Sequence, residues 1–121
     1  MMFTLVYVGW IVSIIGALPL VLGGAMNMMK ASVMVKNMEH VGFSPDVLPV
    51  FGFIKIVIAA VSLVPATSFI GAILATGWMG GAISAHIRVR DPYFVQVFIP
   101  IVIWVGFGLR HQDAMHSLLR F

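Results

Sequence analysis

Four polar side chains interrupt or end long apolar stretches of the sequence at matching depths. They are Asn27, Lys55, His86 and Gln96. Because a helix rises about 1.5 Å per residue, Lys55 lies about 9 Å inside its stretch, and Gln96 lies about one turn into the last stretch. Asn27 and His86 close their own stretches, and Trp78 lies about 12 to 15 Å farther in than His86. We therefore expect these five side chains to converge on one ligand-binding site.

Lys55 carries the most information, because an ammonium group inside an apolar span is rare and marks a functional candidate. The apolar stretches contain no Asp or Glu, so its counter-charge must come from Glu39, Asp46 or Asp91 in the polar segments, or from a ligand. A lysine this close to a helix end can also snorkel, with its amine among the lipid headgroups. Both readings remain open on the sequence.

No set of residues for catalysis or metal binding stands out in the sequence. Cysteine is absent, which removes thiolate chemistry, disulfide exchange and iron–sulfur clusters. His86 can donate a hydrogen bond, titrate near neutral pH or lie at an interface. It lacks a convincing haem partner, since His40 lies in a loop and His111 and His116 do not share a helix face. We expect no catalytic residue, no metal and no haem.

The composition places the chain in a membrane. Of its 121 residues, 61% are hydrophobic and only 9% are charged, against roughly 25% charged in a soluble domain. The net charge of +3 forms no basic stripe, so we expect membrane lipids rather than nucleic acid as partners. The charges expected at the interface are Lys30, Arg88, Arg90 and Asp91. We expect a multi-pass integral membrane protein of the bacterial cytoplasmic membrane.

Breaks between the apolar stretches predict four spans. We place them at about residues 3–26, 49–65, 67–86 and 93–109, with an interfacial segment at 27–48. Ser44 can cap the helix that follows it, Pro45 suits a first helical turn, and Pro65 divides a run too long for one crossing. The sequence thus predicts an all-α fold in which residues 1–121 form a single domain, an antiparallel four-helix membrane bundle.

Small residues indicate how these helices meet, because close backbone approach drives helix association in lipid. Gly9, Gly16 and Gly23 repeat every seven residues along the first span. A small-xxx-small series, Gly77, Gly81 and Ala85, follows the third span. We expect both series to serve helix packing.

The order of motifs resembles the DoxX-like family over nearly the whole chain. The motifs are Gly42-Phe43-Ser44-Pro45, the stretch 48–55 that ends in Lys55, Pro65, Gly71-Ala72-Ile73-Leu74, and Gly80-Gly81-Ala82-Ile83-Ser84-Ala85-His86-Ile87-Arg88-Val89-Arg90-Asp91-Pro92. The resemblance implies a four-helix integral membrane protein and little about activity. Some members are small subunits of membrane redox assemblies, including thiosulfate-to-quinone electron transfer, and distant eukaryotic relatives are membrane chaperones. Many members carry an acidic residue where this chain has Lys55, so a proton-handling role of that carboxylate does not carry over.

Three functions remain open on the sequence. The first is a non-enzymatic accessory or helper subunit whose pocket on one leaflet binds a lipid, a quinone or a partner helix. The second is the membrane subunit of a quinone-linked oxidoreductase, which must take its electrons from another protein. The third is an oligomeric small-molecule transporter. The expected partners are lipids, and either another membrane protein or further copies of the chain.

Overall fold

Long apolar runs form the four longest helices of the protein, two of which contain an internal proline, Pro19 in α1 and Pro100 in α5. The computed structural model describes residues 2–119, and no strand occurs within this range. The long helices are α1 (Met2–Met28), α3 (Leu48–Leu63), α4 (Ser68–Arg88) and α5 (Phe94–Arg110). The short helices are α2 (Ser32–Val41) and α6 (Gln112–Leu118), with single 3-10 turns at Pro45–Val47 and Pro65–Thr67. The all-helical fold class predicted from the sequence is confirmed.

The helix ends follow from local chemistry that the sequence displays. The Ser44 hydroxyl accepts a hydrogen bond from the Asp46 amide at 3.3 Å, with Pro45 in the first turn, so the predicted cap is confirmed. Pro65 lacks an N–H group and separates α3 from α4. Gly42 ends α2 with a φ of 90°, a left-handed conformation that glycine adopts without a steric penalty.

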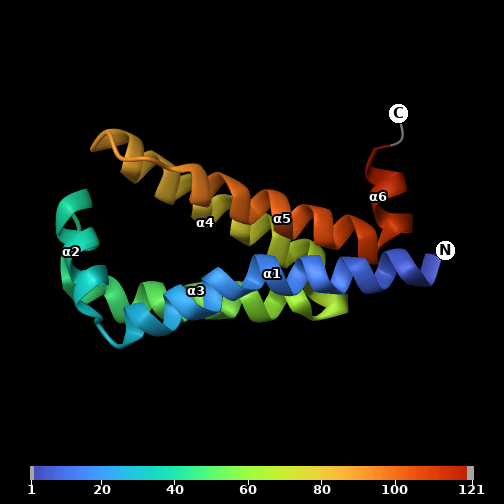
Figure 1. Ribbon diagram of the computed structural model, residues 1–121, viewed down its shortest axis with the longest axis horizontal. Helices are drawn as coiled ribbons and strands as arrows, with labels where there is room; N and C mark the ends of the chain where they lie inside the picture. Colours follow the sequence, from blue (N-terminus) through green and yellow to red (C-terminus); the bar gives the residue numbers. More distant parts are fainter. Residues whose placement is uncertain (1, 120–121) are drawn as a thin grey trace.

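Each long helix packs against two of the others. α1 contacts α3 and α5, and α4 contacts the same two helices, so the contacts close into a ring. Figure 1 shows α1 and α3 as one layer and α4 and α5 as a second layer. The two layers lie close together at the end that holds both termini and spread apart toward α2. α6 turns away from α5 by 110°.

Small side chains allow the helix backbones to approach closely. The contiguous core consists of Ala17, Leu20, Ile58, Ala59, Ala72, Ala75, Met79 and Ile103. Where α1 crosses α3, a Cβ atom on Gly52 would overlap the Gly24 carbonyl oxygen and lie 2.9 Å from the Met28 amide nitrogen. Where α3 meets α4, a Cβ atom on Gly71 would overlap the Ser62 backbone. These glycines hold the helices together by dispersion contacts.

The glycines singled out in the sequence fall into two groups. Gly9 and Gly16 lie against α5, where an added Cβ would come within 2.8 Å of Leu109 and 3.0 Å of Ile103. In contrast, Gly23 lines a cavity, and its neighbour Gly24 makes the α1–α3 contact instead.

The sequence predicts that the small residues Gly77 and Gly81 of α4 pack against another helix, and the structure does not show this contact. Gly77 and Gly81 have no atom within 4 Å of an added Cβ. Gly81 and Ala85 line the same cavity as Gly23. The buried face of α4 is formed by Gly71, Ala72 and Ala75, and Gly77 and Gly81 are exposed.

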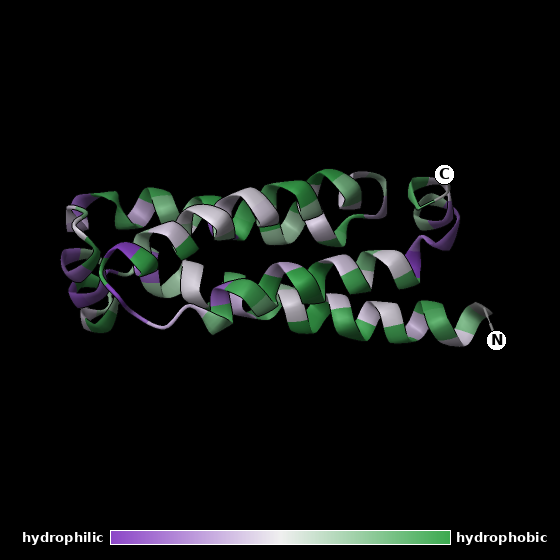
Figure 2. Cartoon of the chain, turned by 90° about the horizontal axis from the view of Figure 1, so that it is seen from above, coloured by the Kyte–Doolittle hydropathy of each residue, from purple (hydrophilic) through white to green (hydrophobic). Residues whose placement is uncertain are grey.

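Apolar side chains cover the outside of the helices along their length. Figure 2 shows hydrophilic residues gathered around α2 and at the α5–α6 corner, with mainly hydrophobic residues between them. Three helical segments of residues 2–119 are long and apolar enough to cross a membrane: Phe3–Met28, Pro45–Leu63 and Pro65–Arg88. α5, with 17 residues, joins them only when it is counted together with the bent α6.

Candidate functional site

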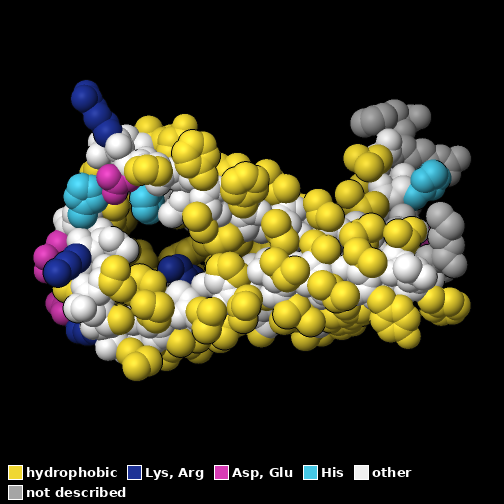
Figure 3. All heavy atoms as spheres, in the orientation of Figure 1, with side chains coloured by type: hydrophobic (Ala, Val, Ile, Leu, Met, Phe, Trp, Pro, Cys, Tyr) yellow, Lys and Arg dark blue, Asp and Glu magenta, His cyan; other side chains and the backbone are white. Residues whose placement is uncertain are grey.

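A cavity of about 410 Å³ lies between the two helix layers at the end where they spread apart. Its volume falls in the range of about 300–1,000 Å³ that is typical of small-molecule sites. Figure 3 shows the surface hollowed near α2, with a basic side chain inside the hollow. All five side chains expected to form a ligand site line this cavity, and they are Asn27, Lys55, Trp78, His86 and Gln96.

Each polar residue reaches the cavity from a different long helix. Asn27 lies in the last turn of α1, and Lys55 is the eighth residue of α3. His86 lies in the last turn of α4, and Gln96 lies in the first turn of α5. Because neighbouring helices run in opposite directions, these positions share one level.

Lys55 points into the cavity and reaches a buried partner on α1. With the Asn27 amide oriented so that both of its ends are satisfied, its oxygen accepts a hydrogen bond from Lys55 Nζ at 3.1 Å. The amide nitrogen then donates to the Gly23 carbonyl at 3.2 Å. Asn27 is only 1% exposed, so this contact belongs to the interior. The ammonium group is therefore held by a neutral acceptor.

None of the three carboxylates that the sequence offers as counter-charges for Lys55 forms an ion pair with it. Asp46 pairs with Lys30 at 3.7 Å, and Asp91 pairs with His40 at 2.9 Å. Glu39 forms no ion pair with Lys55, and no carboxylate within residues 2–119 does. An anionic partner of Lys55 must therefore come from outside this part of the chain.

His86 presents a defined nitrogen atom to its surroundings. Its Nδ1 lies 2.8 Å from the Ala82 carbonyl oxygen one turn earlier in α4. A carbonyl oxygen can only accept, so Nδ1 carries the proton of this bond. In the neutral ring, Nε2 is then a hydrogen-bond acceptor. The cavity thus combines a donor on α3 with an acceptor on α4.

An aromatic wall, formed by Phe43, Phe51 and Trp78, completes the cavity. The ring centroids of Phe51 and Trp78 lie 5.0 Å apart, and those of Phe43 and Phe51 lie 5.7 Å apart, both edge to face. Phe43 and Phe51 were not among the residues expected at the site. The signal for Phe51 is its spacing, because it precedes Lys55 by four residues and so shares a helix face with it.

α2 closes the end of the cavity and is tied to its neighbours. Met34, Met38 and Val41 of this helix line the cavity. The Arg88 guanidinium, at the end of α4, donates a hydrogen bond to the Val41 carbonyl. The contact between His40 Nε2 and Asp91 Oδ2 joins α2 to the α4–α5 turn.

The charged residues expected at the interface all lie near this end. Lys30 lies in the turn between α1 and α2, and Arg90 and Asp91 lie between α4 and α5. Lys30 and Arg90 have φ values of 52° and 62°, a left-handed conformation that is uncommon outside glycine. These tight turns place the charges around the mouth of the cavity.

Comparison with known proteins identifies the family. A family model described as the DoxX-like family matches residues 11–107, which include all five expected site residues. The chain belongs to the DoxX-like family. The resemblance read from the motifs is thereby confirmed, and together with the apolar helices it makes the chain a multi-pass membrane protein. Comparison with curated proteins and with solved structures gave no match.

In this DoxX-like protein, Arg110 forms a second polar cluster at the opposite end from the cavity. Its Nη2 donates to the Ser62 carbonyl at 2.8 Å and to the Ser68 hydroxyl at 3.0 Å. Its guanidinium carbon lies 4.4 Å from the centroid of the Trp10 ring. Arg110 therefore joins α1, α5 and the α3–α4 turn, a role that its position near the end of an apolar stretch did not reveal.

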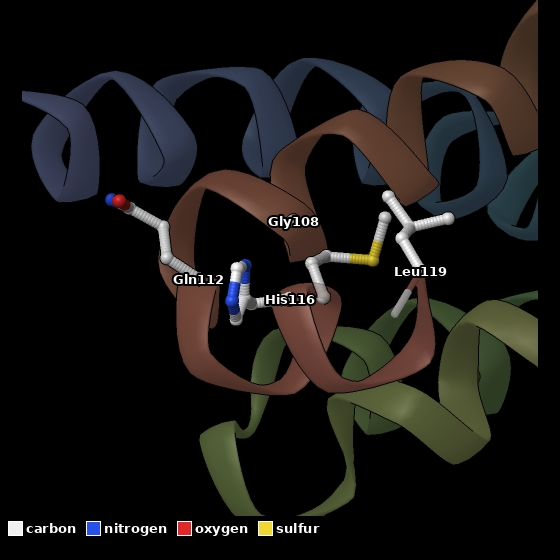
Figure 4. Close-up of a pocket in the computed structure, with 5 residues that line it drawn as sticks. Gly108, Gln112, His116 and Leu119 are labelled. Atoms are coloured by element: carbon white, nitrogen blue, oxygen red, sulfur yellow. The ribbon is translucent and has the colours of Figure 1, made fainter. Parts of the chain in front are cut away.

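A shallower cavity of about 420 Å³ lies at the α5–α6 corner of the DoxX-like protein. Gly108, Gln112, Met115, His116 and Leu119 line it. Figure 4 shows the Gln112 side chain extending away from the other lining residues, so the polar groups of this cavity do not converge. Residues 2–119 bring together no group of three acidic or histidine side chains that could hold a metal ion. The cavity beside α2 is the candidate site.

Proposed function

We propose that this DoxX-like protein is a non-enzymatic accessory membrane protein whose cavity binds an amphiphilic ligand from one leaflet. The observation that carries the proposal is the Lys55 ammonium group, which lines an apolar cavity and has, within residues 2–119, only the neutral Asn27 amide as its partner. An ionisable group within a membrane protein is costly unless it serves a ligand or partner. A ligand with an acceptor oxygen would satisfy it.

The proposal includes a membrane bundle of four antiparallel spans. The 17 residues of α5 give a length of about 25 Å, which is at the lower limit for crossing the apolar layer. α5 packs against α1 and α4, both of which are long enough to span. Its exposed side chains Phe94, Val95, Phe98, Ile101 and Val105 suit a lipid environment. α2 would then lie at the membrane surface.

The cavity lining favours binding over catalysis. Among the described residues, those that line it include no hydroxyl, carboxylate or thiol side chain. Its polar groups are one amine, one imidazole, the indole N–H of Trp78 and the amides of Asn27, Asn37 and Gln96. A nucleophile paired with a base, the usual arrangement for group transfer, is therefore not part of this lining.

A second candidate function is a membrane subunit of a quinone-linked oxidoreductase. The observation that favours it is the pairing of the Lys55 donor with the His86 acceptor beside an aromatic wall. A quinone carbonyl could accept a hydrogen bond from Lys55, and a hydroxyl of the reduced quinol could donate one to His86 Nε2. The test is near-ultraviolet absorbance of the purified protein, in which a bound quinone changes its spectrum on chemical reduction. A spectrum that does not respond to the reductant would exclude this candidate.

Native mass spectrometry of the protein released from mild detergent tests the proposed function. We expect wild type to carry an amphiphile whose occupancy falls at least about tenfold in Lys55→Met, because methionine keeps the length of the stem and removes the charge. Lys36→Met is the matched control, since Lys36 is exposed on α2 and does not line the cavity. A second polypeptide in place of the amphiphile would identify a partner helix or another copy as the occupant. A bare chain in both wild type and variant would contradict the proposal.

A further inference from the structure

The cavity has an uncompensated positive charge. Among the described residues that line it, Lys55 is the only lysine, arginine, aspartate or glutamate. The two nearby carboxylates with assigned partners, Asp46 and Asp91, pair with groups outside the cavity. With Lys55 protonated, the lining carries a charge of +1 that no carboxylate within residues 2–119 neutralises.

We infer that the cavity selects a monoanionic amphiphile, with a singly charged oxyanion at Lys55 Nζ and an apolar tail against the aromatic wall. The inference rests on the proposed function and adds the charge class of the ligand. A fatty-acid carboxylate and the phosphodiester of an acidic phospholipid share this chemistry. Both are components that a cavity opening to one leaflet can exchange with the membrane.

Hydrogen-bond capacity at Lys55 supports an anion over a neutral ligand. An ammonium group has three N–H donors, and Asn27 accepts one of them at 3.1 Å. Two donors are left for a ligand, and an oxyanion can accept both bonds while also carrying the opposite charge. A neutral alcohol offers an acceptor but leaves the charge uncompensated in a poorly solvated site. The anion satisfies both requirements.

The remainder of the cavity suits the tail of the same ligand. Phe51, Trp78 and Ile99 contribute apolar surface from three different helices. Leu20 and Met79, which are 1% and 4% exposed, form the boundary with the core. A polar headgroup at the level of Lys55 thus has apolar side chains beside it, which is the arrangement that an amphiphile requires.

Matched ligand pairs in native mass spectrometry test the inference on delipidated wild type. Palmitate is compared with hexadecanol, which has the same chain and no charge, and phosphatidylglycerol is compared with phosphatidylcholine of the same acyl chains. In at least one pair, we expect the anionic member to bind at least about tenfold more tightly than its partner without net charge. The preferred pair identifies the source of the anion. Acetate, an anion without a tail, is expected not to compete.

The variants separate this inference from the proposed function. In Lys55→Met the preference for the anion should disappear, while Lys36→Met should retain it. If Lys55→Met does not fold, Lys55→Arg keeps the charge and should keep the preference, and the wild-type comparison decides alone. Equal binding of charged and neutral members to wild type would overturn the inference and leave the proposed function standing. Binding of none of the four amphiphiles would contradict both.

Discussion

Replacing Gly52 with alanine should force α1 and α3 apart beside the cavity. The added Cβ atom would overlap the Gly24 carbonyl oxygen, lie 2.9 Å from the Met28 amide nitrogen and lie 2.7 Å from Met28 Cγ. Two of these atoms belong to the backbone, which cannot move aside as a flexible side chain can. The helices themselves must therefore shift.

The magnitude follows from two opposing effects. Alanine is a better helix former than glycine by about 1 kcal/mol. Overpacking of a close contact costs about 1–3 kcal/mol, and overlap with backbone atoms places this site toward the upper value. We expect Gly52→Ala to lower the free energy of unfolding by about 0–2 kcal/mol overall.

Gly80→Ala is the matched control for this prediction. Gly80 also lies inside a long helix, α4, but no atom lies within 4 Å of an added Cβ there. It should therefore show only the favourable helix-propensity effect of about 1 kcal/mol. The difference between the two variants, about 1–3 kcal/mol, measures the cost of the helix contact.

The assay is unfolding by a denaturing detergent in mild-detergent micelles, followed by circular dichroism. The midpoint for Gly52→Ala should fall below that of Gly80→Ala by an amount equivalent to this difference. If both alanine variants unfold at the same midpoint, α1 and α3 do not meet at Gly24 and Gly52, and the reasoning from close contact is refuted.

The same assay checks three further predictions. Ser13 carries a buried hydroxyl without a partner among the described residues, so Ser13→Ala should leave stability unchanged or raise it by about 1 kcal/mol; a clear loss would show a bond that we have missed. Arg110→Lys should cost about 1.5–3 kcal/mol, because lysine cannot reproduce the guanidinium contacts to the Ser62 carbonyl and the Ser68 hydroxyl, and an unchanged midpoint would contradict this. Burial and, secondarily, the Arg110 charge lower the pKa of His111 from its usual 6.5, so the folded state favours the neutral ring. The contribution of His111 to the free energy of unfolding should be fully present above about pH 6.5 and should decline as the pH falls below that value. His111→Asn should weaken this pH dependence.

The meeting of the five expected side chains at one cavity was predictable because it depends on distances along single helices. Asn27, His86 and Gln96 lie within a turn or so of helix ends that polar residues define, and Lys55 lies at a known rise from its own end. Antiparallel connections then bring equal depths to one level. The rotation of each helix about its axis was not fixed by this reasoning, which is why Phe51 was missed. Phe43 lies between α2 and the turn at Pro45–Val47, where helix geometry gives no position.

The choice of packing glycines shows what spacing alone leaves undetermined. A seven-residue repeat selects Gly9, Gly16 and Gly23 as one face of α1. However, α1 contacts α5 through Gly9 and Gly16 but contacts α3 through Gly24, one residue and about 100° around the helix from Gly23. A helix with two neighbours changes its contact face along its length.

Contacts between segments distant in the sequence were also beyond prediction. Arg110 reaches the Ser62 carbonyl across 48 positions of the chain. The sequence shows a single basic residue after an apolar stretch, which is equally typical of a lysine or arginine among lipid headgroups. Only the packing of α5 beside the α3–α4 turn reveals its partners.

The two helix layers are joined at one end and lie apart at the other, so a small change in the angle between them would change the space near α2 most. The Arg110 contacts join the layers at one end, so a small rotation about that end would move α2 and the residues near Lys55 farther than residues close to Arg110. At the open end, α2 is bonded to the α4 side through Arg88 and through His40. Arg88, His40 and Asp91 do not line the cavity themselves, so a change at one of these contacts would act on the cavity only through the position of α2.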